Sequence, residues 1–362
     1  MPLYRKLLGV SAAAALTASA TGARKKARRR AIELGAPFGV LPTLPAGPSR
    51  RVGVVYNPSK PGVAVAIEIL ERILAANGHP KALVRTTRVD EPGSEAAREL
   101  IAEGVDLLIA AGGDGTVRAV AAALAHHEGR KPRLGILPMG TGNLLARNLY
   151  IPVSDVAACV NIALNGAGQS VDAIEMTTTG TTGEETEHTF FVMSGAGFDA
   201  LVMNDTNEEI KAKFGWVAYV QSGMKHMLGR SHPVRISVDG GEPRILPMRS
   251  VLVANCGRLQ GGIRLADMTD VHDGKLEVIV ASPRDLVEWG LLMAKVMRRT
   301  ILGSPRIELP VIRHLVGSEV VLEFPEGAQP VEVDGDPAPS AHRISARVLP
   351  AAVEVAVHPE VL

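Results

Sequence analysis

Three short turns with glycine and polar residues each follow an apolar run typical of a buried strand. The turns are NPSKPG at 57–62, GGDGT at 112–116 and MGTGN at 139–143. Glycine lets the backbone approach a ligand closely, and its free N–H groups can bind phosphate oxygens. Asp114, between glycines, is placed to meet phosphate or metal. A single GGDG turn is as often a structural connection, but three that converge predict a phosphate site.

The elements around these turns indicate an α/β domain. Strands are expected at 51–57, 81–87, 105–111 and 133–139, and amphipathic helices at 64–77, 94–103, 117–126 and 153–164. Strands that alternate with helices predict a parallel sheet covered on both faces. The carboxyl ends of its strands share one edge, so the turns should lie together.

Strand patterns dominate from residue 171 onward and predict a second, mostly antiparallel domain, interrupted by helical segments at 210–228 and 284–302. With 362 residues the chain exceeds the usual size of one core. We therefore expect a nucleotide-binding domain at 49–170 and a β-rich substrate domain at 171–362, after an extension and proline-rich linker at 1–48. The cleft between the two domains is the expected active site.

The three turns, in this order and spacing, resemble the diacylglycerol kinase catalytic family, in its bacterial soluble branch, related to sphingosine and ceramide kinases. The likeness continues through KAKFGWVAYVQSGMKHML at 211–228, HDGKLEVIV at 272–280 and VEVDGDPAP at 331–339, and covers roughly 50–358. It implies a Rossmann-like, NAD-kinase-like α/β domain followed by an antiparallel β-sandwich. It also implies ATP-dependent transfer of the γ-phosphate to a lipid hydroxyl, with diacylglycerol as the expected acceptor and phosphatidic acid as the product.

The resemblance assigns ATP binding to the three turns and to a threonine after the second strand. Asp114 is expected near the phosphates and the catalytic metal, and the hydroxyls of Thr116 and Thr141 are expected as added donors. Thr86 competes with Thr87 in the alignment, because one residue separates them. The predicted ATP-binding residues are Asn57, Pro58, Ser59, Lys60, Thr87, Gly112, Gly113, Asp114, Gly115, Thr116, Gly140, Thr141 and Asn143.

The second catalytic carboxylate is expected from VEVDGDPAP. In the bacterial enzymes the second acidic residue of this turn is a glutamate that acts as the general base. Here it is Asp336, one methylene shorter, so it needs a closer domain or an intervening water. From the residues alone, a turn of Asp, Gly, Asp and Pro is an ordinary hairpin connection. Leu144 is a further departure, because the bacterial members commonly carry an aspartate there, which makes the acceptor lipid less certain.

A magnesium site is expected at MTDVHDGKL, residues 268–276. The resemblance places Asp270, Asp273 and the carbonyl of Lys275 as its ligands, and oxygen ligands of this kind suit a hard cation that keeps several waters. Spacing alone favours a simple Asp-Gly turn between strands.

Composition argues against a nucleic-acid partner. The net charge is +1 and the aromatic fraction is 3%, so the chain offers neither a basic field nor a stacking surface. Cys159 and Cys256 lie in apolar contexts and are expected in the core, which suits a reducing cytosol.

The N-terminus combines a weakly apolar stretch at 7–20 with a basic cluster at 24–30. The stretch is shorter than the ~20 residues needed to span a bilayer, although its end resembles a signal-peptidase site. We expect a cytoplasmic enzyme that acts on a lipid at the membrane surface, with the basic cluster on anionic lipids of the inner leaflet. A solvated helix without a role is the alternative, and a homodimer is compatible with the sequence.

Other functions remain open at this stage. A sphingosine- or ceramide-type lipid kinase shares the motifs, and an NAD kinase shares the GGDGT turn. A non-catalytic nucleotide-binding regulator is the third alternative, because Leu144 and Asp336 depart from the catalytic pattern of the family.

Overall fold

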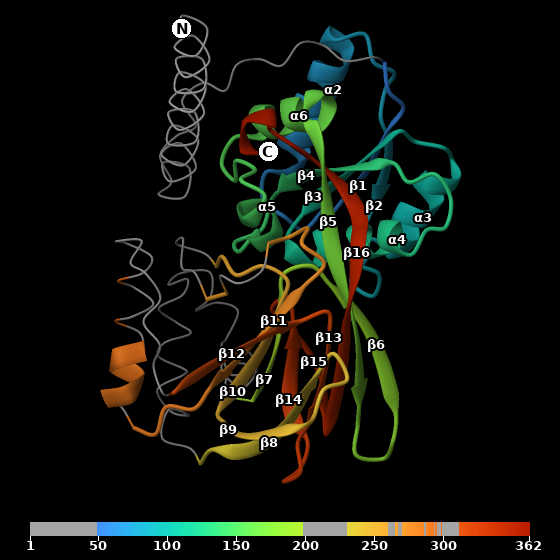
Figure 1. The fold of residues 1–362 in the computed structure, drawn as a ribbon. Helices are drawn as coiled ribbons and strands as arrows, with labels where there is room; N and C mark the ends of the chain where they lie inside the picture. The colour runs from blue at the N-terminus through green and yellow to red at the C-terminus, as the bar shows by residue number, and fades with distance from the viewer. Residues whose placement is uncertain are drawn as a thin grey trace, which may run out of the picture.

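The computed structural model describes residues 49–197, 230–259, 265–266, 270–285, 287–292, 294, 298 and 311–362. Helices surround a sheet in the upper half of Figure 1, and strands predominate in the lower half, with a short orange helix at its left edge. Two long strands, β5 (Ala167–Thr179) and β16 (Arg343–Val357), run through both halves (Figure 1).

The first half is a parallel sheet in the order β2-β1-β3-β4. It alternates with helices as the hydrophobic pattern predicted: β1 (Val52–Tyr56), α2 (Val63–Ala76), β2 (Leu83–Thr86), α3 (Ser94–Ala102), β3 (Leu107–Gly112), α4 (Asp114–Ala125), β4 (Arg133–Pro138), α5 (Leu144–Asn148) and α6 (Val156–Asn165). Every residue of β3 is buried, as expected for a central strand that is covered on both faces.

The second half contains a six-stranded antiparallel sheet in the order β12-β11-β10-β7-β14-β15. It faces β16, β13, β8 and β9, which extend the first sheet with antiparallel pairing. A second apolar core lies between them, with Val278 and Val280 from one sheet and Ile344 from the other. The strands are β6 (Glu185–Phe190), β7 (Met193–Gly197), β8 (His232–Val238), β9 (Arg244–Met248), β10 (Ser250–Ala254), β11 (Leu276–Ala281), β12 (Ile312–Gly317), β13 (Glu319–Glu323), β14 (Gln329–Val333) and β15 (Asp336–Ala341). A 3-10 turn, Pro359–Val361, follows β16. This is the predicted β-sandwich.

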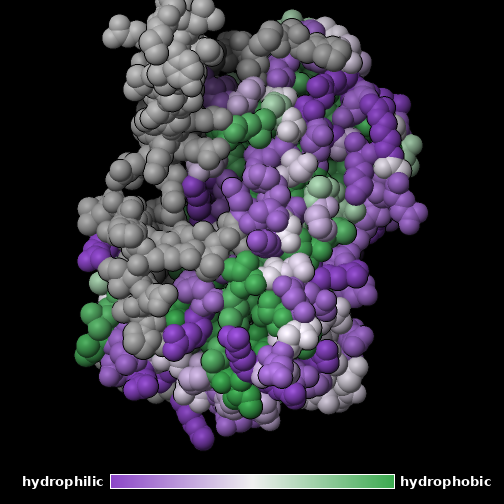
Figure 2. Space-filling model, in the orientation of Figure 1, coloured by the Kyte–Doolittle hydropathy of each residue, from purple (hydrophilic) through white to green (hydrophobic). Residues whose placement is uncertain are grey.

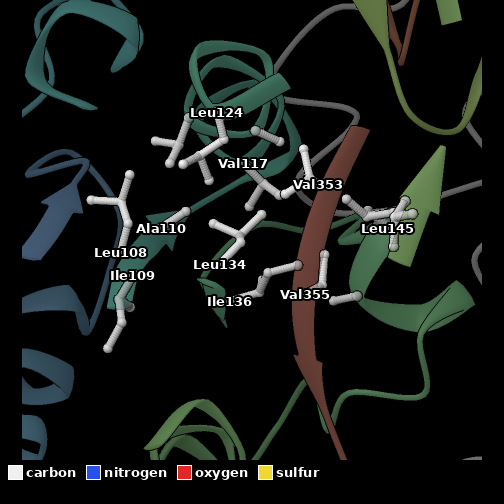
Figure 3. Close-up of a cluster of buried hydrophobic side chains, with 14 of the residues drawn as sticks. Leu108, Ile109, Ala110, Val117, Leu124, Leu134, Ile136, Leu145, Val353 and Val355 are labelled. Atoms are coloured by element: carbon white, nitrogen blue, oxygen red, sulfur yellow. The ribbon is translucent and has the colours of Figure 1, made fainter. Parts of the chain in front are cut away.

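The end of the chain returns to the first half. β16 pairs in parallel with β4 at Val355 and Leu134, and antiparallel with β5 along most of its length. Val353 and Val355 pack with Leu134 and Val117 in the first core (Figure 3). The boundary expected between 170 and 171 falls inside β5, and the first core includes residues from 352 onward. Two continuous strands therefore tie the domains together.

Several local predictions differ from the structure. α4 begins at Asp114 instead of 117: Gly113 is its N-cap residue, and Gly115 and Thr116 belong to its first turn. α6 begins at Val156, after Asp155 accepts the N–H of Ala158 and caps it. β9, β12 and β15 were not expected. The helix expected at 210–228 lies outside the described residues, as does much of the one expected at 284–302, of which 287–292 are helical.

Both cysteines are buried and free, as predicted. Burial raises the pKa of each thiol well above its ordinary value, so neither is a thiolate at neutral pH. Among the described residues, no helix is long and apolar enough to cross a membrane.

Candidate active site

The three predicted turns meet at one edge of the parallel sheet. The N–H of Asn57 donates to the carbonyl of Ala111 at 3.0 Å, and that of Met139 donates to the carbonyl of Gly112 at 2.8 Å. These bonds fix the turns after β1 and β4 against the turn after β3.

The second and third turns touch through their backbones. A Cβ placed on Gly140 would lie 2.7 Å from the Cα of Gly113, which is closer than real Cβ contacts allow. A Cβ on Gly112 would lie 2.5 Å from the Cβ of Thr116, whose side chain is buried beneath the turn. Glycine is therefore required at both positions because of close packing.

The carboxylate of Asp114 holds the third turn in place. One oxygen accepts the N–H of Asn143 at 2.8 Å and the other accepts the N–H of Leu144 at 2.5 Å. A Cβ on Gly142 would lie 2.8 Å from the first of these oxygens. Each carboxylate oxygen retains a further lone pair, so Asp114 can still face a cation.

Asn143 gives the third turn its shape. It has a left-handed backbone, with φ of 50°, which asparagine tolerates better than most residues. Its buried side-chain amide accepts the N–H of Gly140 at 2.9 Å and donates to the carbonyl of Gly140 at 2.7 Å. Thr141 is exposed in the same turn.

The first turn places the positively charged side chain of Lys60 at the site. Asn57 accepts hydrogen bonds from the N–H and the hydroxyl of Ser59, at 3.0 and 2.7 Å, and so closes the turn that contains Pro58. The Nζ of Lys60 lies 3.8 Å from the position of a Cβ on Gly113. Lys60 therefore lies over the GGDG turn, where it can offset phosphate charge.

The two candidate threonines, Thr86 as the last residue of β2 and Thr87 directly after it, are in different environments. Thr87 is buried, its N–H donates to the carbonyl of Tyr56 at 2.9 Å, and its methyl group faces Gly93 at the start of α3. Thr86 is exposed. The geometry does not assign a nucleotide contact to either.

Asp336 crosses from the second domain to the GGDG turn. It is the first residue of β15, and its Oδ2 lies 3.3 Å from the position of a Cβ on Gly115. Arg118 donates to the same oxygen at 2.7 Å. Of the two predicted catalytic carboxylates, Asp114 therefore belongs to the GGDG turn and Asp336 lies beside Gly115 of the same turn.

Arg118 was missed by the sequence analysis. It follows Asp114 by four residues, so both side chains lie on one face of α4. That spacing becomes visible only when the helix is known to begin at Asp114.

The other acid of the DGD turn has a different role. Asp334 is buried and accepts the N–H groups of Phe191, Val192 and Met193 at 3.2, 3.1 and 2.9 Å. Burial raises its pKa to about 6, although Arg118 and the three N–H groups oppose the shift. Asp334 therefore anchors the hairpin.

A cavity at the domain junction reaches from the anchor to the turns. Asp114, Arg118 and Asn143 line it from the first domain, and Asp334 and Phe191 line it from the second. It joins the buried anchor of the hairpin to the predicted phosphate site.

The predicted magnesium turn at 270–275 is held by the sandwich. Asp273 accepts the N–H groups of Asp270 and Lys275, each at 3.0 Å, and the buried Asp172 accepts the N–H of Gly274 at 2.7 Å. Within the described ranges, no group of three or more His, Cys, Asp or Glu side chains could hold a metal. The assignment of Asp270, Asp273 and the carbonyl of Lys275 as magnesium ligands therefore stays a prediction.

Leu144 begins α5 and packs, half-buried, against the first core. An apolar contact therefore occupies the position at which the bacterial members commonly carry an aspartate. The backbone N–H of Leu144 still donates a hydrogen bond to Asp114, so the fold of the turn does not need an acidic side chain here.

Two families of domains match the chain in succession. The diacylglycerol kinase catalytic domain matches residues 51–176, and the YegS C-terminal NAD kinase beta sandwich-like domain matches residues 192–357. The protein "Probable lipid kinase YegS-like" of Xanthomonas euvesicatoria pv. vesicatoria (strain 85-10) is 32% identical over 265 residues, which is 72% of this chain and 81% of that protein. The chain belongs to the diacylglycerol kinase catalytic family.

Other relatives agree with this membership. The diacylglycerol kinase of Bacillus subtilis (strain 168) is 28% identical over 244 residues, which is 66% of this chain and 76% of that enzyme. A diacylglycerol kinase structure from Bacillus anthracis str. Sterne covers 87% of this chain and 100% of its own, with a TM-score of 0.62 at 22% identity. Yeast NADH kinase matches with a TM-score of 0.50 at 12% identity. The last two likenesses concern the fold, and they confirm the NAD-kinase-like arrangement that the family predicted.

Proposed function

We propose that this protein is an ATP-dependent lipid kinase that transfers the γ-phosphate to a lipid hydroxyl, with diacylglycerol as the acceptor. The observation that carries the proposal is the approach of Asp336, from the sandwich domain, to Gly115 of the GGDG turn, in a chain of the diacylglycerol kinase family. A phosphate cradle from one domain and a carboxylate from the other are the parts that phosphoryl transfer to an alcohol needs.

Each part has a defined task in this reaction. Backbone N–H groups of the GGDG turn and the ammonium of Lys60 bind the phosphates and offset their charge. Asp336 accepts the hydrogen of the lipid hydroxyl and orients it for in-line attack. Because the transition state of phosphoryl transfer is loose, positioning contributes more than the strength of the base.

Magnesium fits this site. Kinases hold Mg²⁺ with one or two carboxylates and the substrate phosphates, and Asp114 has free lone pairs beside the turn. Bound there, the ion would neutralise phosphate charge. Asp270, Asp273 and the carbonyl of Lys275 would hold a second ion, which would brace the turn before β11.

The acceptor depends on the surroundings of Leu144. A sphingosine- or ceramide-type lipid is the second candidate, because the resemblance to sphingosine kinases includes an apolar residue after this asparagine. Diacylglycerol is favoured because the named relatives from Bacillus are diacylglycerol kinases.

To reach a lipid in a membrane, the protein must contact the membrane surface. Residues 287–292 are helical, and Val287 and Leu291, one turn apart, are 70% and 57% exposed. Figure 2 shows hydrophilic and hydrophobic residues on both halves of this face, with the larger hydrophobic patches in the lower half. Together with the basic cluster at 24–30, which lies outside the described residues, this favours a peripheral enzyme on anionic lipid.

The test is incubation of the full chain with γ-labelled ATP, Mg²⁺ and, separately, diacylglycerol, a sphingoid base, ceramide or NAD. Labelled phosphatidic acid is the expected product. Asp336→Asn should reduce its formation by ~100-fold or more, whereas the exposed control Asp90→Asn should not change it. Label in NAD alone would identify an NAD kinase, and no label in any acceptor, with ATP still bound, would identify a nucleotide-binding regulator.

A further inference from the structure

One arginine forms hydrogen bonds on both sides of the hairpin turn that carries the predicted base. Nη1 of Arg118 donates to the carbonyl of Val333, the last residue of β14, at 2.6 Å. Nη2 donates to Oδ2 of Asp336, the first residue of β15, at 2.7 Å. The guanidinium is a rigid, planar fork, so these two bonds fix the direction of the carboxylate as well as its distance.

The two oxygens of Asp336 have different surroundings. Oδ2 faces Arg118 and the backbone of Gly115. Oδ1 accepts no hydrogen bond from any residue that the structure describes, and the side chain is 54% exposed. One oxygen is therefore held by the protein, and the other is open to an incoming hydroxyl.

The ion pair contributes to geometry more than to stability. Asp336 is half-exposed, and pairs of this kind typically stabilise a fold by about 1 kcal/mol or less. The carboxylate is also one methylene shorter than the expected glutamate, so its reach depends on where the hairpin is held. Arg118 extends from α4, the helix that starts at the GGDG turn, and so links the position of the base to that of the phosphate cradle.

We propose that Arg118 is a positioning residue that acts through Asp336: it fixes one carboxylate oxygen over the GGDG turn and leaves the other to bind the lipid hydroxyl. This inference rests on the proposed kinase function and adds a residue to it. The competing role for Arg118 is direct binding of the nucleotide phosphates, which would not depend on Asp336.

A double-mutant cycle separates the two roles. Wild type, Arg118→Ala, Asp336→Asn and the double variant are assayed as full chains for kcat and for the KM of ATP, with diacylglycerol as acceptor. We expect Asp336→Asn to lower kcat by ~100-fold or more, and Arg118→Ala to lower it by ~10-fold with an unchanged KM for ATP. The double variant should lie within ~2-fold of Asp336→Asn, because Arg118 has nothing left to position.

Two further variants distinguish a loss of positioning from misfolding. Arg118→Lys keeps one charged donor and should recover part of kcat. Arg72→Ala removes an exposed pair with Glu68 on α2 and should change nothing. If Arg118→Ala lowers the melting temperature by more than about 5 °C, Arg118→Gln replaces it in the cycle, since its amide can still donate to Val333.

Multiplicative losses of kcat in the double variant, or a KM for ATP raised ~10-fold by Arg118→Ala, would show that Arg118 acts on the nucleotide or on the fold, and would overturn the proposal. An absence of labelled lipid with the wild-type protein is a separate result, and it would refute the kinase function itself.

Discussion

Asp114 and Asn143 are joined by a hydrogen bond of 2.8 Å from the backbone N–H of Asn143 to the carboxylate of Asp114. This contact connects the first turn of α4 to the turn after β4, and the N–H of Leu144 serves the second oxygen. Asp114 therefore shapes the site that it is expected to serve in catalysis. The two roles have different consequences when the side chain is changed.

Asp114→Asn should lower kcat by ~100-fold or more and also lower stability. An amide is uncharged and offers one acceptor oxygen, so one backbone N–H loses its acceptor, at a cost of about 1.5 to 3 kcal/mol, and the other keeps only a neutral one. Urea unfolding measures the second effect and labelled-lipid formation the first. Asp90→Asn, on an exposed loop, is the control. A variant with full activity would remove Asp114 from the mechanism.

Gly140→Ala should weaken ATP binding by ~10-fold or more. The new methyl group would lie 2.7 Å from the Cα of Gly113 and 3.0 Å from the Oδ1 of Asn143, so the two turns must separate. Equilibrium dialysis with ATP measures the loss. The matched control is Gly290→Ala, where nothing lies within 4 Å of the new Cβ. Equal affinities in both variants would contradict the close packing of the turns.

Patterns that are local and repeated in the sequence predicted the first half of the fold. Apolar strands followed by glycine turns fixed the parallel sheet and the meeting of 57–62, 112–116 and 139–143 at one edge. The pairing of β16 with β4 was not predicted, because Leu134 and Val355 are 221 residues apart and no local pattern records their contact. Arg118 was not predicted for two reasons: its helix was expected to begin at 117, which separated it from Asp114, and its partner Asp336 lies in another domain.

Burial of Asp334 predicts a specific pH dependence of stability. Its pKa is about 6 in the folded protein, against an ordinary value near 3.8, so the folded state binds the proton more tightly than the unfolded state. Its contribution to stability is therefore greatest below pH ~4 and is lost as the pH rises through about 6. Two pKa units correspond to about 3 kcal/mol.

The difference in unfolding free energy between wild type and Asp334→Asn isolates this group, because the other titrations cancel. Wild type should lose stability relative to the variant between pH 4 and 6, with a constant difference above about pH 7. The exposed Asp90→Asn should leave the profile unchanged. A difference that does not vary with pH would mean that Asp334 is ionised throughout this range.

Residues 1–48 should determine binding to anionic membranes. The cluster at 24–30 contains six basic residues, and each contributes on the order of 1 kcal/mol near an anionic surface. Deletion of 1–48 should therefore reduce co-sedimentation with vesicles of mixed anionic and neutral lipid by ~10-fold or more, with a smaller effect at high salt because the attraction is screened. Neutral vesicles provide the control.

Since the described domains begin at residue 49, turnover of lipid dispersed in detergent should survive the deletion. Unchanged sedimentation would show that residues 49–362 make the membrane contact. Val287 and Leu291, which are exposed, would then be the first residues to change to Ser.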